Sequence, residues 1–90
     1  MADVSPTAKL AARRIRELRV EKRLTQEKLA YLAGLNKGQM SKIEREKSEP
    51  GVGTLEKIAK ALGVHLADLL VDPAASEAER AISALSKGRA

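Results

Sequence analysis

The sequence predicts a compact all-α domain of five helices and leaves open a short sixth helix near the C-terminus. Its 90 residues suffice for one domain with a modest core. Residues that favour helices dominate: the apolar residues are mainly Leu, Ala, Ile and Val, with one Tyr and no Phe or Trp. Apolar residues also recur at helical spacing between recognisable start and stop signals.

The first helix is expected to begin at Ser5 and Pro6, a capping hydroxyl followed by proline at the first helical position, and to end near Arg23. Its apolar stripe consists of Ala8, Ala11, Ala12, Ile15 and Leu18. Arg19 falls on this stripe and must be paired there, because an isolated buried charge is very costly. Glu44, which flanks the core side of the third helix, is the best candidate partner.

The second helix should open at Thr25, with Leu24 and Leu29 at the spacing of a hydrophobic staple. The residues expected to face inward are Leu29, Leu32 and Ala33. Gly34 ends this helix, since a left-handed turn residue is best without a Cβ.

The third helix follows almost at once, and Asn36 with Gln39 reads as a capping box at its start. Met40 and Ile43 point into the core, and Gln39 falls on the same inward side of the helical wheel. The opposite side carries Lys37, Gly38, Ser41, Lys42 and Arg45.

A polar loop over residues 46–53 should separate the third helix from a fourth that stops at Gly63. A short fifth helix over residues 65–70 presents Leu66, Leu69 and Leu70. Ser76 with Glu79 is another capping box, which could begin a sixth helix. Residues 5–71 are therefore assigned to one domain, and residues 72–90 to a tail or short helix that could serve dimerisation.

Composition excludes several classes of protein. The absence of Cys rules out disulfides and thiolate metal sites, and one His with few Asp leaves no nucleophile–base pair or ligand cluster. We therefore expect neither an enzyme nor a cofactor. No apolar run approaches the roughly 20 residues that span a membrane, and no secretory signal opens the chain, so a cytoplasmic protein is expected.

The net charge of +5 is unevenly distributed. Residues 9–47 contain twelve Lys or Arg against five Glu, whereas the rest of the chain sums to −2. A basic half suggests a face built to meet a polyanion. A solvated surface on an ordinary helical protein explains the charge equally well.

Two short helices joined by a tight glycine turn are the signature of a helix-turn-helix. Ala30 is small where the second helix must approach the first closely, and Gly34 supplies the turn. The shared core would come from Leu29, Leu35, Met40 and Ile43. These features combine with a basic outer face on the second helix of the pair, which favours DNA as the polyanion.

Residues 10–70 resemble the Cro/repressor-type (XRE) helix-turn-helix family, most specifically in TQ-x-x-LA, SKIE-R and L-x-KIAKALGV. The resemblance implies a lambda-repressor-like domain whose third helix enters the major groove of double-stranded DNA. It also implies that Arg19 pairs with Glu44 and that Gln26 contacts a phosphate. The resemblance further implies that Lys37, Gly38, Gln39 and Lys42 lie on or beside the base edges. With the outward face of the third helix added, the DNA-binding candidates are Gln26, Lys37, Gly38, Gln39, Ser41, Lys42 and Arg45.

The individual roles stay open at this point. Gly38 either lets the helix backbone come close to the duplex or is merely tolerated at a cost of about 1 kcal/mol relative to Ala. Lys37 and Lys42 can donate to guanine or only neutralise phosphate. The family often has basic residues after the third helix, whereas this chain has Glu46 and Glu49, which argues against phosphate contacts from that loop.

The function expected from these observations is a sequence-specific transcriptional regulator of repressor or controller type, binding a palindromic operator as a homodimer. The apolar residues expected at the dimer interface are Leu66, Leu70, Val71, Ile82 and Leu85. The alternative is an antitoxin-like or accessory protein that holds a partner protein through its C-terminal tail. A protein of this kind would bind no DNA on its own at low salt.

Overall fold

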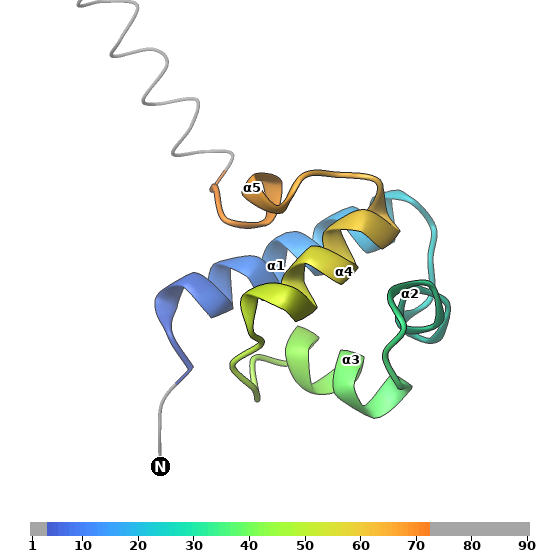
Figure 1. The fold of residues 1–90 in the computed structure, drawn as a ribbon, viewed down its shortest axis with the longest axis horizontal. Helices are drawn as coiled ribbons and strands as arrows, with labels where there is room; N and C mark the ends of the chain where they lie inside the picture. The colour runs from blue at the N-terminus through green and yellow to red at the C-terminus, as the bar shows by residue number, and fades with distance from the viewer. Residues whose placement is uncertain (1–3, 73–90) are drawn as a thin grey trace, which may run out of the picture.

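The structure, a computed structural model, describes residues 4–72; the predicted sixth helix, with Ile82 and Leu85, lies outside the described residues. Five α-helices and no strand occur within residues 4–72, as predicted (Figure 1). The helices are α1 (Pro6–Glu21), α2 (Gln26–Ala33), α3 (Lys37–Glu44), α4 (Val52–Leu62) and α5 (Leu66–Leu69).

The starts of the first three helices are fixed by side chains, as the sequence predicts. The Ser5 hydroxyl accepts from the backbone N–H of Ala8, and the Thr25 hydroxyl caps α2 in the same way. At α3, Asn36 and Gln39 form the complete capping box, each side chain accepting from the backbone N–H of the other. These caps satisfy N–H groups that have no partner inside their own helix.

Helix α4 starts earlier than predicted. Val52 and Gly53, assigned to the loop, form its first turn, and the backbone N–H of Leu55 donates to the carbonyl of Gly51 at 3.0 Å. The residue at the N-cap is Gly51, which has no side chain with which to cap the helix. The usual sequence signal of a helix start is therefore missing here, which is why the prediction was wrong by two residues.

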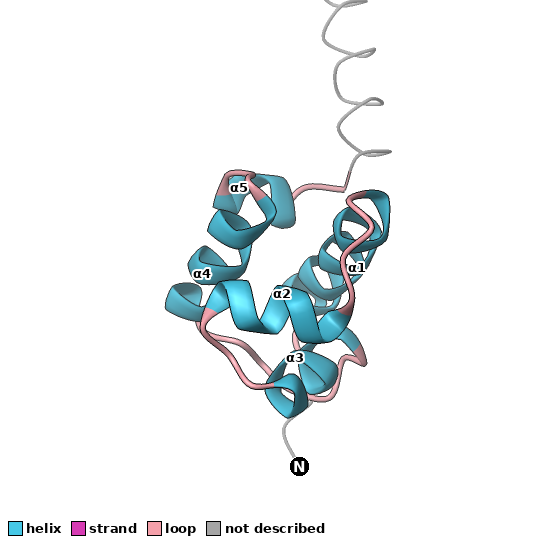
Figure 2. Cartoon of the chain, turned by 90° about the vertical axis from the view of Figure 1, so that its right-hand side faces the viewer, coloured by secondary structure: helices cyan, strands magenta, loops and turns pink. Residues whose placement is uncertain are grey.

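The five helices surround one apolar core. Helix α2 packs against both α3 and α4, and α1 packs against α3, α4 and α5 (Figures 1 and 2). The largest fully buried apolar side chains come from every helix: Ile15, Leu29, Met40, Ile58, Leu62 and Leu69. Helix α3 is therefore held on one side by the rest of the domain, and its other side is left to solvent.

Two apolar residues do not lie where the sequence placed them. Leu32 is 47% exposed, because Leu29, Ala30 and Ala33 already fill the inner face of the eight-residue α2. Leu70 follows α5 as its C-cap and is 36% exposed, so it is not part of the inner face of that helix. Both predictions relied on helical spacing alone, which does not say how wide the buried stripe is.

Candidate DNA-binding surface

Helices α2 and α3 form the predicted helix-turn-helix. Gly34 caps α2 in the left-handed conformation, with φ of 72°, and the backbone N–H of Leu35 returns to the carbonyl of Ala30 at 2.8 Å. Ala30 is buried, as expected of the small residue at the point of closest approach. The turn therefore redirects the chain between the two helices within residues 34–36, and α3 starts at Lys37.

The two sides of α3 differ sharply in character. Met40, Ile43 and Glu44 are buried, and they fasten the helix to the core. The other side presents exposed Lys37, Gly38, Lys42 and Arg45, with Ser41 half-buried beside them. The predicted outward set therefore shares one accessible, basic face, although the Arg45 Nε also donates to the carbonyl of Ser41 at 3.4 Å.

Gln39 is exposed, which contradicts the inward position given by the helical wheel. Its side-chain oxygen accepts from the backbone N–H of Asn36 at 2.9 Å, which draws the side chain toward the start of the helix. The side-chain NH₂ group takes no part in this bond. Gln39 is thus both a cap residue and a member of the accessible surface.

Gly38 lies on this face next to the cap. A Cβ added at Gly38 would approach the Oδ1 of Asn36 to 3.3 Å, and that oxygen is the acceptor of the capping bond. A side chain here would therefore press on the cap. This geometry adds a local reason for glycine to the two interpretations left open by the sequence.

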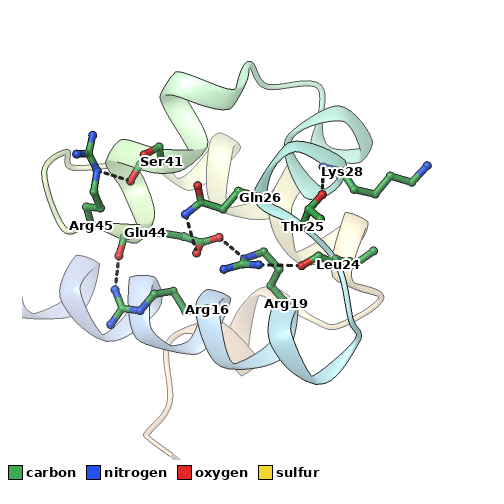
Figure 3. A network of polar contacts seen from close by, with 9 residues as sticks. All are labelled: Arg16, Arg19, Leu24, Thr25, Gln26, Lys28, Ser41, Glu44 and Arg45. Carbon is green, nitrogen blue, oxygen red and sulfur yellow. Dashed lines mark hydrogen bonds and ion pairs between the residues drawn. The ribbon is translucent and has the colours of Figure 1, made fainter.

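A buried carboxylate joins α1, α2 and α3 (Figure 3). Glu44 is 1% exposed, and its Oε2 lies 2.8 Å from the Nε of Arg19, which confirms the predicted pair. Its Oε1 accepts from the Gln26 side chain at 3.2 Å. Arg16 donates to the backbone carbonyl of Glu44, and the Nη1 of Arg19 donates to the Leu24 carbonyl at 2.8 Å.

Gln26 thus has a structural partner that the sequence did not suggest. It is the first residue of α2, half-buried, and its amide points at Glu44 (Figure 3). A primary amide carries two N–H groups. One bond to Glu44 therefore fixes the side chain at the helix N-terminus and leaves donor capacity for a ligand.

Other contacts of the site also escaped sequence reasoning. Arg16 lies three residues before Arg19 on the same helix, and this spacing was the signal available for its contact with Glu44. The carboxylate of Glu49, in the loop after α3, is bonded to Ser5 at the start of α1. A separation of 44 residues leaves no local sequence signal for that pair.

A hollow of about 250 Å³ lies between α3 and the following loop. Its lining includes Gln39 and Lys42 from α3 and Glu49 from the loop.

Within residues 4–72, no group of three His, Asp or Glu side chains could hold a metal ion. No described helix is long and apolar enough to cross a membrane.

Comparison with known proteins gives consistent matches. Residues 15–69 match the family model HTH_3, described as helix-turn-helix. The immunity repressor of Bacillus phage phi105 is 35% identical over 68 residues, which is 76% of this chain and 47% of that repressor. The control protein C.BamHI of Bacillus amyloliquefaciens is 40% identical over 62 residues, covering 68% of this chain and 76% of that protein.

The fold has a solved counterpart at similar identity. The crystal structure of a hypothetical transcription factor NHTF from Neisseria aligns with a TM-score of 0.75 and 32% identity, covering 84% of this chain and 91% of that one. The chain spans about half the length of the phage repressor. These matches are to transcription regulators rather than to enzymes. The chain belongs to the HTH_3 (XRE/Cro-C1 type) helix-turn-helix family of DNA-binding transcription regulators.

Proposed function

We propose that this regulator binds a palindromic operator as a homodimer, with α3 in the major groove of each half-site. The observation that carries the proposal is the outward face of α3. Its exposed cations, Lys37, Lys42 and Arg45, stand on a helix whose opposite side is locked into the core by Met40 and Ile43. A helix held this rigidly can present its side chains to base edges in a fixed register.

Within the groove, Lys37 and Lys42 have donors that suit the O6 and N7 acceptors of guanine. Gly38, between them, leaves the backbone bare and allows a close approach to the duplex. The side-chain NH₂ group of Gln39, which the capping bond does not use, is a further donor. Ser41 and Arg45, the C-cap residue of α3, complete the surface.

Gln26 is proposed to bind a phosphate. It begins α2, where backbone N–H groups and the positive end of the helix dipole favour an anion. Its bond to Glu44 holds the side chain in one orientation, and the second N–H of the amide can donate to a phosphate oxygen. Such a contact positions the protein on DNA without reading the sequence.

The homodimer is proposed to form through the region after α4. Leu70 and Val71 are exposed next to each other at the end of α5, while Leu66 is partly buried against the core. One domain reads only a few base pairs, so two-fold pairing across a palindrome, with half-sites ~34 Å apart, doubles the readout. The repressor and control protein among its relatives support a role in repression or control of transcription in the cytoplasm.

The test is selection of bound sequences from a random pool of DNA duplexes. The proposal predicts an enriched palindrome whose half-sites are one helical turn apart. Enrichment of a single unrepeated half-site would overturn the homodimer. If the protein retains no DNA even at low salt, the function lies instead in holding a partner protein, as expected of an antitoxin-like or accessory protein.

A further inference from the structure

The carboxylate of Glu49, in the loop between α3 and α4, is held by one residue at the start of α1. The backbone N–H of Ser5 donates to Oε1 at 2.8 Å, and the Ser5 hydroxyl donates to Oε2 at 2.9 Å. The same hydroxyl accepts from the backbone N–H of Ala8 at 3.0 Å. Ser5 therefore caps α1 and binds both oxygens of Glu49 at once.

This carboxylate lies beside the surface that the proposed function places on DNA. Glu49 lines the same hollow as Gln39 and Lys42 of α3. In Figure 1 the loop, drawn in yellow-green, lies between the first turn of α1 and α3. With α3 on DNA, a free negative charge beside this face would repel the phosphates that come within a Debye length of it, which is about 8 Å at physiological salt.

The hydrogen bonds from Ser5 reduce that repulsion. Hydrogen bonds from an N–H and an O–H group to a carboxylate are charge-assisted and stabilise its negative charge where it lies. The N-terminal end of a helix also carries partial positive charge, and α1, with 16 residues, begins at this point. While Ser5 holds Glu49, the charge is therefore offset by α1. Once released, the side chain could rotate toward the hollow and the phosphates.

We infer that Ser5 is a positioning residue for DNA binding: it holds Glu49 on the N-terminal end of α1 and so keeps an acidic side chain from opposing the duplex. The inference rests on the proposed function, since it needs α3 to face DNA. It explains how this chain carries a glutamate beside a surface that must meet a polyanion.

The experiment measures the affinity of the full chain for its selected operator by fluorescence anisotropy, at about 50 mM salt and at higher salt, where exposed charges are screened. Ser5→Gly removes the hydroxyl and its bond to Oε2, so that the backbone N–H bond to Oε1 alone is left to hold the carboxylate. Glycine is an acceptable N-cap, so α1 keeps its start. Glu49→Gln removes the charge and keeps the shape. Glu21→Gln, at the far end of α1, is the matched control, and circular dichroism checks that each variant is folded.

Ser5→Gly should weaken binding about three- to tenfold at low salt, as expected for one added repulsion near the phosphates, and the difference should shrink as salt rises. Glu49→Gln and Glu21→Gln should bind within about twofold of the parent. The double variant Ser5→Gly with Glu49→Gln should match Glu49→Gln alone, because no charge is left to release.

Two results would overturn the inference while leaving the proposed function standing. One is a Ser5→Gly variant that binds as well as the parent. The other is a double variant as weak as Ser5→Gly, which would mean that the hydroxyl acts only by ordering the helix. A parent protein whose binding to DNA shows no salt dependence would contradict the proposed function itself, and the inference with it.

Discussion

The Nε of Arg19 lies 2.8 Å from the Oε2 of Glu44, and this pair joins α1 to the last residue of α3. The carboxylate is almost fully buried, whereas the Arg19 side chain is 17% exposed. Since Gln26 binds the other carboxylate oxygen, the orientation of α3 depends on both α1 and α2. The helix expected to enter DNA is thereby fixed from its C-terminal end.

Replacing Glu44 should therefore be costly. Glu44→Ala leaves the Arg19 guanidinium and the Gln26 amide without their acceptor in a buried place, and should lower the free energy of unfolding by about 3 kcal/mol. Urea denaturation measures the change. The exposed pair of Arg14 and Glu17 is the comparison, and Glu17→Ala should cost less than about 0.5 kcal/mol. Equal losses in the two variants would contradict the structural role of Glu44.

A substitution at Arg23 should stabilise the fold, in contrast to Glu44→Ala. Arg23 adopts φ of 58°, in the left-handed region, just after the C-cap of α1. Since a Cβ is strained there and glycine is not, Arg23→Gly should raise the free energy of unfolding by about 1 kcal/mol. Lys22→Gly, at the neighbouring C-cap with φ of −87°, removes the same charge without relieving strain. Thermal unfolding should show a higher Tm for Arg23→Gly only; a lower Tm in both would argue against strain at Arg23.

The turn of the helix-turn-helix can be tested with two glycines. Gly34 has φ of 72°, and an added Cβ would meet no atom within 4 Å, so Gly34→Ala tests backbone strain alone. It should lower the free energy of unfolding by about 1 kcal/mol. Gly53 lies in the first turn of α4, also with open space around it. Gly53→Ala should raise the free energy of unfolding by up to about 1 kcal/mol through helix propensity. Urea denaturation should therefore show changes of opposite sign in the two variants.

The proposed dimer predicts that a substitution at its interface halves the mass of the sedimenting particle. Leu70→Lys places a charge on the exposed apolar pair formed with Val71, and should shift the protein from dimer to monomer in sedimentation equilibrium, because a buried unpaired charge is very costly. Val20→Lys is the control on α1, where the parent side chain is 64% exposed. A parent protein that sediments as a monomer both free and on DNA would rule out the interface.

Much of this fold is predictable because its signals are local. Caps at Ser5, Thr25 and Asn36 and the stop at Gly34 each depend on residues within one helical turn, and all four are confirmed. The pair of Arg19 and Glu44 was also predictable, since a charge on an apolar stripe needs a partner and Glu44 flanks the core side of the third helix.

What escaped prediction depends on geometry that the sequence does not encode locally. The bond between Ser5 and Glu49 depends on how the loop after α3 returns to α1. The exposure of Leu32 depends on how much of the narrow α2 surface the neighbouring helices cover. The start of α4 depends on Gly51, a cap without a side chain. The first two are set by tertiary packing, which overrides spacing and propensity, whereas the third lacks the side-chain signal of a helix start.

The central claim is that α3 reads bases whereas the N-terminus of α2 holds phosphate, and two alanine variants separate these roles. Affinities are measured for the selected operator and for a set of single base-pair changes, over a range of salt. Gln26→Ala should weaken all sequences alike. Lys42→Ala should lose affinity and also discrimination at one base pair, by about 1–3 kcal/mol if the contact is to guanine.

The control is Lys57→Ala, an exposed lysine of α4 that lines a different hollow, which should change neither quantity. A lysine that only neutralises phosphate would lower the salt slope by about one unit and leave base preference unchanged. The account predicts loss of preference at one position in Lys42→Ala and none in Gln26→Ala. Unchanged base preference in both Lys42→Ala and Lys37→Ala would contradict direct readout by these lysines.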